Sequence, residues 1–315
     1  MKLIIQIPCF NEAATLRTAL DALPKSIDGI DEIEILIIND GSTDETVAVA
    51  KDWGVNHVVS HVGNKGLAVG FMTGLSECLA RGADIIVNTD ADNQYNADDI
   101  PSLIAPLLAN EAEFVIGARP IAEIEHFSPI KKVLQKIGSA FVRFMSETDV
   151  ADAPSGFRAL TRHAAMQLNV FSQYTYTLET IIQAGVKNIP VVNVPVRTNE
   201  DLRPSRLVKS IRDYVKRSIL TIFRVFIIYR PFRFLGLLGS ALIGAGLILG
   251  LRYLYFVAIG EGDGHIQSVI LTAILLLMGY HTFSLAVLAD LISINRRLLE
   301  KLQVHLREIR LSRNP

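Results

Sequence analysis

The stretch DIIVNTDADNQ, residues 84–94, decides the fold class because it joins an apolar strand to an acidic loop. Its first half, Asp84–Asn88, has the length and composition of a buried strand. Two carboxylates, Asp90 and Asp92, follow directly. Oxygen ligands at a strand end suit Mg²⁺ or Mn²⁺, which keep open positions for substrate phosphates. The stretch therefore predicts a strand followed by a metal site, although Asp-x-Asp pairs also occur on solvated turns.

The sequence around this stretch repeats the same strand-then-helix pattern. Strand-like apolar runs also occur at Leu3–Ile7, Glu34–Ile38 and Phe114–Ile116. Helical periodicity fills the intervening segments, at Ala13–Leu23, Thr43–Asp52, Lys65–Ala80 and Ala97–Leu108. This alternation predicts βαβ units and a largely parallel sheet.

Polar clusters follow the first two strands as well, at residues 11–12 and 39–42. In open α/β sheets the ligand crevice lies at the carboxyl ends of the strands, so we expect these loops to converge with the Asp90 loop. Asp40 is placed to accept hydrogen bonds from a base or ribose, whereas Asp44 fits a first-turn helix acid. Lys65, in a glycine turn before a helix, is a candidate phosphate contact.

The composition indicates a membrane-associated protein. Half of the 315 residues are hydrophobic and 20% are charged, and the mean hydropathy of +0.33 is high for a soluble enzyme. The net charge of −1 argues against a nucleic-acid binder. Cys9 and Cys78 are expected to be buried free thiols in a reducing compartment. The first apolar run is too short for a signal peptide, so we expect the catalytic part to be cytoplasmic.

After Arg197 the chain changes character. Leu207–Tyr229 mixes Lys and Arg with apolar residues at helical intervals, as in a membrane-surface helix, although an ordinary packed helix has a similar pattern. Phe234–Leu251, extended by Tyr253–Ile259, and Ile266–Leu288 are each long enough to cross about 30 Å of hydrocarbon. An acidic loop joins these runs and basic residues flank their outer ends. The positive-inside rule then puts both termini in the cytoplasm.

Four motifs together resemble glycosyltransferase family 2 with the GT-A fold: Pro8–Glu12, Asn39–Asp44, Asn64–Gly74 and Asp90–Gln94. The segment Asp152–Arg158 and the terminal hairpin narrow the likeness to polyprenyl-phosphate glycosyltransferases, the group of dolichol-phosphate mannose synthase and the bactoprenol glucosyltransferases. The resemblance covers about residues 3–206 by motif and the remainder by architecture. It implies an α/β GT-A domain, Rossmann-like with a mostly parallel sheet, followed by amphipathic interface helices and a two-helix transmembrane hairpin.

The resemblance also implies roles for individual residues on the donor side. Pro8, Phe10, Glu12 and Asp40 match positions around the nucleotide, with Phe10 in place of a frequent Tyr. Asp90, Asp92 and Gln94 match positions that bind metal and nucleotide.

Cationic residues are assigned to the phosphates of donor and acceptor. Arg119 matches a residue facing the phosphates. Arg203 and Arg206 lie where the family has cations near the lipid phosphate, with Arg206 in place of a common Lys. Lys132 belongs to a basic cluster that is suited to guiding an anionic lipid but equally suited to a solvated helix face.

The general base is left open by the sequence. Asp152 is a candidate, but it fits a turn cap before Pro154 equally well, and some bactoprenol enzymes carry an acidic residue where this chain has Gly156. A phosphate acceptor is already anionic at neutral pH, so positioning and leaving-group stabilisation are expected to matter more than deprotonation. Asp92, Asp152 and Arg119 are the candidate catalytic residues.

We therefore expect a catalytic domain at 1–206, interface helices at 207–231, two transmembrane helices at 232–295 and a basic cytoplasmic helix at 296–315. The expected reaction is metal-dependent, inverting transfer of one sugar from a UDP- or GDP-sugar to a polyprenyl phosphate. Membrane lipid and a homo-oligomer are further expected partners, and a prokaryotic plasma membrane is the expected location. Two alternatives stay open: a glycosyltransferase with a different acceptor, such as a polysaccharide or another lipid, and a non-catalytic nucleotide-binding membrane scaffold.

Overall fold

The computed structural model describes residues 1–120, 138–140, 142–143, 146–170, 176–199, 227, 229, 231–261, 264 and 266–313. The chain forms two compact units. The first comprises Met1–Ile222 with Leu302–Pro315, and the second comprises Phe223–Lys301.

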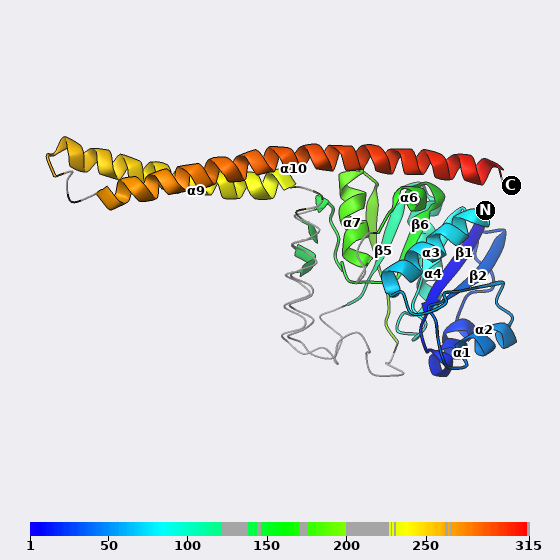
Figure 1. Cartoon of the computed structure of the whole chain (residues 1–315). Coiled ribbons are helices and arrows are strands. Elements are labelled where there is room, and N and C mark those ends of the chain that lie inside the picture. Colours follow the sequence, from blue (N-terminus) through cyan, green and yellow to red (C-terminus); the bar gives the residue numbers. More distant parts are fainter. Residues whose placement is uncertain are drawn as a thin grey trace. The chain divides into compact units, whose positions relative to one another are not determined.

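The first unit is built on one seven-stranded sheet (Figure 1). Its strand order is β3-β2-β1-β4-β6-β5-β7. The strands pair in parallel except for β6, which runs antiparallel to both β4 and β5. The strands are β1 (Lys2–Cys9), β2 (Glu32–Asn39), β3 (His57–Ser60), β4 (Ile85–Asn88), β5 (Phe114–Ala118), β6 (Arg158–Thr161) and β7 (Val191–Pro195). The expected mostly parallel α/β sheet is confirmed.

Helices cover both faces of this sheet because its central strands are apolar on both sides. Alternate β1 residues, among them Leu3, Ile5 and Ile7, pack into one core with α1 and α4. On the opposite face, Gly74 of α3 lies against β1 and β2. The helices of the first unit are α1 (Ala13–Asp21), α2 (Thr46–Trp53), α3 (Leu67–Ala80), the 3₁₀ turn η1 (Ala97–Asp99), α4 (Ile100–Leu108), α6 (Arg162–Gln167) and α7 (Thr177–Val186).

The expected strands and helices are present, but β3, β6 and β7 were not expected from the sequence. β3 has only four residues, and β6 begins with Arg158, a charged residue that is nevertheless fully buried. The expected helix over 97–108 is divided into η1 and α4. Cys9 and Cys78 are buried free thiols, as expected.

Asp44 organises the start of two helices. Its Oδ2 accepts the Ala13 amide of α1 at 3.1 Å, and its Oδ1 accepts the Thr46 amide of α2 at 3.1 Å. Partial burial acts to raise the pKa of Asp44, but the hydrogen bonds from Thr46 and Ala13 outweigh it and hold the pKa below its ordinary value. The expected structural role of Asp44 therefore extends to both helices.

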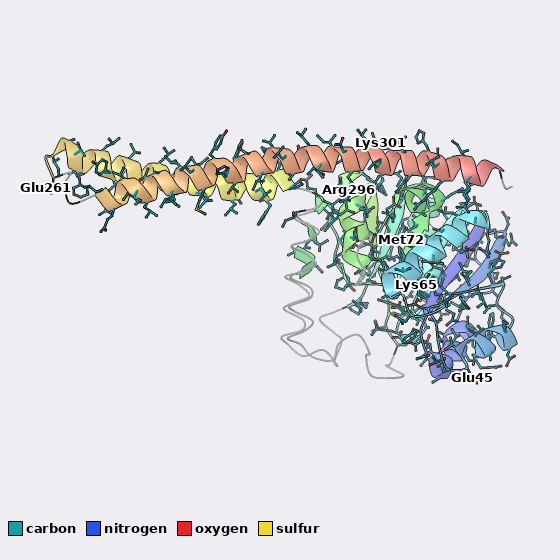
Figure 2. All side chains as sticks on the ribbon, in the orientation of Figure 1. Glu45, Lys65, Met72, Glu261, Arg296 and Lys301 are labelled. Carbon is teal, nitrogen blue, oxygen red and sulfur yellow. The ribbon has the colours of Figure 1, made fainter. Side chains whose placement is uncertain are left out.

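The second unit contains α9 (Pro231–Ala258) and most of α10 (Ile266–Arg313), which run antiparallel as a hairpin (Figure 1). A Cβ on Gly279 would lie 3.0 Å from the Gly239 carbonyl oxygen, so these glycines allow the two helices to approach closely. Glu261 lies at the turn between them (Figure 2). Both helices are long and apolar enough to cross a membrane, and large side chains such as Leu277 are exposed along them.

The C-terminal helix expected at 296–315 is continuous with the second apolar helix as far as Arg313, because no helix-breaking residue separates them. Within the second unit, Arg296 pairs with Glu300 at 2.9 Å and lies 3.9 Å from the centroid of the Tyr229 ring. The interface helices expected at 207–231 lie almost entirely outside the described residues. The expected domain boundaries remain a prediction.

Candidate active site

Asp90 lies in the loop after β4, at the carboxyl edge of the sheet. Asn88, the last residue of β4, donates hydrogen bonds to the Gly156 carbonyl at 2.8 Å and to the Tyr176 hydroxyl at 3.0 Å. A Cβ on Gly156 would lie 3.0 Å from Asp90 Oδ2 and 3.1 Å from the Tyr176 hydroxyl. Because glycine occupies position 156, the backbone before β6 packs directly against the Asp90 carboxylate.

Buried polar and aromatic groups support this loop from within the sheet. Gln6 of β1 donates to Asn88 Oδ1 at 2.8 Å. The Tyr176 ring stacks on Phe71 of α3, with a centroid distance of 3.9 Å and an interplanar angle of 6°. No local sequence signal indicated Tyr176, which reaches Asn88 from 88 positions along the chain. The support of Asp90 is therefore set by tertiary packing.

The electrostatic environment of Asp90 favours a bound cation. Burial, the largest cause, acts with the neighbouring charge of Asp92 and a smaller contribution from Glu12 to raise the pKa of Asp90 to about 7. Arg119 opposes this effect but does not cancel it. A positive charge beside Asp90 would favour the ionised carboxylate and remove the repulsion from Asp92.

The residues present fit a divalent cation that is shared with a substrate. Among the residues that the structure describes, no three His, Cys, Asp or Glu side chains form a complete metal cage. Mg²⁺, however, is commonly held by one or two carboxylates, with waters and substrate phosphates as its other ligands. Asp90 and Asp92 supply that donor set. The backbone amide of Gln94 donates to Asp92 Oδ1 at 3.2 Å, so the loop is folded back on itself at this point.

Arg119 and Asp152 form a nearly buried ion pair. Arg119 Nε donates to Asp152 Oδ2 at 2.7 Å and Nη2 donates to Oδ1 at 3.1 Å. The side chains are only 7% and 1% exposed. Arg119 Nη1 also reaches Gln94 Oε1 at 3.4 Å, and its guanidinium lies 5.8 Å from the centroid of the Tyr95 ring. The geometry thus brings Arg119 to the Asp90 loop, where Asp152 holds it with two hydrogen bonds. The catalytic role of Asp152 stays a prediction.

Asp40 follows β2 at the same edge, but its carboxylate is engaged by the protein. Oδ1 accepts the Lys65 amide at 2.9 Å and Oδ2 accepts the Gly66 amide at 2.8 Å. His61 Nδ1 lies 2.7 Å from Oδ1. Asp40 therefore fixes the loop that leads into α3. The Lys65 side chain is exposed beside this loop (Figure 2).

Gly41 allows the Asp40 turn to reach that loop. Its φ is +74°, in the left-handed region, and a Cβ would lie 2.5 Å from the Gly63 carbonyl carbon. Any side chain would therefore collide with backbone. Glycine at position 41 is therefore required for the close approach of these two loops.

The loop after β1 presents one exposed ring and one buried carboxylate. Phe10 is 41% exposed, so its ring is accessible for stacking, and Pro8 precedes it as a half-buried residue. Asn11 adopts a left-handed conformation with φ of 56°, and its Oδ1 accepts the Thr43 amide at 2.8 Å. Glu12 is 8% exposed and contributes to the raised pKa of Asp90. The loops after β1 and β4 therefore share one electrostatic environment.

The candidate lipid-phosphate residues Lys132, Arg203 and Arg206 lie outside the described residues. Their roles remain predictions.

Comparison with known proteins extends these findings. The sequence model of the family described as "Glycosyl transferase family 2" matches residues 4–168. A UDP-N-acetylglucosamine–dolichyl-phosphate N-acetylglucosaminyltransferase from Methanococcus voltae is 29% identical over 214 residues, covering 61% of this chain and 83% of that protein. An undecaprenyl-phosphate mannosyltransferase from Micrococcus luteus is 29% identical over 207 residues, covering 62% and 83%.

A similar fold occurs in a solved enzyme. The structure of glucosyl-3-phosphoglycerate synthase from Mycobacterium tuberculosis, in complex with Mn²⁺, UDP and glucosyl-3-phosphoglycerate, superposes with a TM-score of 0.56. The sequence identity is 19%, and the match covers 72% of this chain and 78% of that one. At this identity the likeness concerns the fold, and it confirms the expected GT-A architecture.

Proposed function

We propose that this chain, which belongs to glycosyl transferase family 2 and is a glycosyltransferase, transfers one sugar from a nucleotide-sugar to a polyprenyl phosphate. The two relatives named above act, by their names, on dolichyl phosphate and undecaprenyl phosphate. The two apolar helices of the second unit supply the membrane association that such an acceptor requires.

The observation that carries the proposal is the position of Asp90 and Asp92 in one loop, with Asp90 packed against Gly156 and Arg119 held at the same loop by Asp152. Two carboxylates that repel each other in a partly buried site favour a divalent cation, and such an ion would leave positions open for substrate phosphates. Asp90, Asp92 and Gln94 would hold Mg²⁺ or Mn²⁺. When bound, the cation neutralises the charge that develops on the departing nucleoside diphosphate.

The chain's own residues bind and orient the two substrates. The exposed Phe10 ring stacks on the nucleotide base, and the exposed Lys65 side chain contacts its phosphates. Arg119 directs its guanidinium toward phosphate oxygens from a fixed position, because Asp152 restrains it on two atoms. The acceptor phosphate attacks the anomeric carbon opposite the leaving group, so one displacement inverts the configuration. Asp152 serves as a positioning residue in this reaction.

We assign the reaction to the cytoplasmic surface of a membrane, and the charge pattern around the hairpin supports this assignment. Basic residues flank its outer ends and Glu261 lies at the turn, which the positive-inside rule assigns to the opposite side. The catalytic unit and both termini then face the cytoplasm, where nucleotide-sugars are made.

The proposal is tested by incubating membranes that contain the full chain with single nucleotide-sugars, Mn²⁺ and undecaprenyl phosphate, followed by mass spectrometry. We expect one glycosyl monophosphate lipid from one UDP- or GDP-sugar, and none from the Asp92→Ala variant at equal amounts of folded protein. Transfer only to other acceptors would contradict the assigned acceptor. Full activity of Asp92→Ala would contradict the metal site.

A further inference from the structure

The segment immediately after β7, Arg197–Asn199, lies against the loop that carries Asp92 and Gln94. Thr198 forms an antiparallel bridge with Tyr95. The backbone amide of Asn96 donates to the Arg197 carbonyl at 3.2 Å. A short piece of chain more than 100 positions away in the sequence thus acts as a strand partner of the candidate metal loop.

Asn199 makes the densest set of contacts in this segment. Its side-chain amide donates to the Asn93 carbonyl at 2.9 Å and to the Tyr95 carbonyl at 3.3 Å. Its backbone amide donates to the Gln94 carbonyl at 2.9 Å. One residue therefore binds three successive carbonyls, at 93, 94 and 95. These bonds restrain the loop at the left-handed residue Asn93, whose φ is 58°.

Arg197 fixes the segment itself. Its amide donates to Asp99 Oδ2 at 2.6 Å, and its guanidinium donates to Asp99 Oδ1 from Nε at 2.9 Å and from Nη2 at 2.7 Å. Asp99 is the last residue of η1 and directly precedes α4. Arg197 therefore anchors one end of the Arg197–Asn199 segment to the start of α4, and Asn199 binds the loop of residues 93–95 at the other end.

We propose that Asn199 is a positioning residue for metal and diphosphate binding, acting through the backbone of residues 93–95. The inference rests on the proposed function, because it assigns the metal and diphosphate to Asp90, Asp92 and Gln94. Without the side-chain amide of Asn199, the loop samples other conformations and Gln94 is no longer held beside Arg119. Binding of the metal and nucleotide then has to order the loop, and affinity falls.

Two variants separate the hydrogen bonds from side-chain volume. Asn199→Ala removes the donor, whereas Asn199→Asp keeps the shape but directs an acceptor at the carbonyls of residues 93 and 95. The matched control is Asn56→Ala, because Asn56 Oδ1 accepts the Ile35 amide at 2.9 Å, away from the Asp90 loop. The full chain in detergent micelles is titrated with UDP or GDP in the presence of Mn²⁺ by calorimetry.

We expect Asn199→Ala to weaken Mn²⁺-dependent nucleotide binding by roughly tenfold, and Asn199→Asp by more, because two hydrogen bonds are lost or reversed. Asn56→Ala is expected to bind as the wild type does. In transfer assays the KM for the nucleotide-sugar should rise more than kcat falls, and the Mn²⁺ concentration for half-maximal activity should rise with it. Unchanged binding in both Asn199 variants would overturn the proposal, as would equal weakening in Asn56→Ala.

Hydrogen exchange separates this inference from the proposed function. Peptides that cover residues 92–99 should exchange faster in Asn199→Ala than in the wild type or in Asn56→Ala. Equal exchange would overturn the positioning role whatever the enzyme binds. If the wild type binds neither UDP nor GDP with Mn²⁺, both the proposed function and the predicted effect on affinity are refuted. Faster exchange in Asn199→Ala would then support only the restraint of the loop by Asn199.

Discussion

The loops after β2 and β4 end parallel strands at the same edge of the sheet, yet they treat a carboxylate in opposite ways. Asp40 receives the amides of Lys65 and Gly66 together with His61. Asp90 is instead packed against Gly156 and beside Asp92, and desolvation together with the Asp92 charge raises its pKa to about 7. A carboxylate that accepts hydrogen bonds from the protein stabilises the fold, whereas a carboxylate that is repelled by a neighbouring negative charge is suited to binding a cationic ligand.

The sharpest test of this contrast is Asp90→Asn. We expect transfer to fall by about 10²–10³-fold, because the leaving diphosphate loses stabilisation that matters most in the transition state. Thermal stability without metal should be unchanged or higher, since the substitution removes a buried charge that repels Asp92. A melting temperature well below that of the wild type would show that Asp90 is structural and would break the contrast.

Asp152→Asn tests the second carboxylate of the site. Asparagine keeps one oxygen that accepts a hydrogen bond from Arg119, so we expect a loss of activity of about tenfold, from a single weakened charge-assisted bond. The KM for the acceptor should rise because Arg119 is less firmly held. The pH profile of kcat should keep its shape, and loss of a titrating limb would instead identify Asp152 as the general base.

Asp40→Asn is expected to act on stability more than on chemistry. An amide group in place of one carboxylate oxygen would face the N–H of Lys65 or Gly66, so we expect the free energy of unfolding to fall by about 1–3 kcal/mol. Denaturant unfolding of the full chain measures this change. Residual transfer at low temperature should exceed that of Asp90→Asn, and the reverse order would contradict the division of roles.

Asp44→Asn should give the smallest effect, and one that depends on pH. The pKa of Asp44 is lowered in the folded protein, so its contribution is present above the unfolded pKa of about 3.9 and is lost as pH falls through the folded value. We expect the variant to be less stable by roughly 1 kcal/mol at pH 7, as for a lost helix cap. In paired melting curves the difference should shrink as pH falls below about 4 and disappear below the folded pKa of Asp44, and a difference that grows there would have the wrong sign.

The strands that could be predicted are those whose signal is local. β1, β2, β4 and β5 are apolar runs between polar loops, and that pattern is visible in the sequence. β6 could not be predicted, because Arg158 at its start has the character of a surface residue. In the fold it is buried, and its guanidinium donates to the carbonyls of Ser155 and Ala153 and to Thr180. Burial lowers the pKa of Arg158 to about 10, which no sequence pattern indicates.

The residues of the candidate site also fall into those with a local sequence signal and those without one. Asp90, Asp92 and Arg119 were found from motif and position, and the structure brings them into one electrostatic environment. Tyr176 and Asn199, which support the Asp90 loop, were not found because they carry no local signature, and the same holds for His61, the partner of Asp40. The expected position of Asp40 beside the nucleotide stays a prediction; in the structure its oxygens accept hydrogen bonds from the Lys65 and Gly66 amides.

The local sequence pattern alone determined an α/β sheet with acidic loops at one edge and two apolar helices long enough to cross a bilayer. It could do so because hydrophobic periodicity and the polarity at strand ends depend only on neighbouring residues. The tertiary structure alone decided which donor meets which carboxylate. Asp152 reaches Arg119 across 33 positions and Asn199 reaches Asn93 across 106. Pairings over such separations follow from strand order and packing, which no local pattern encodes.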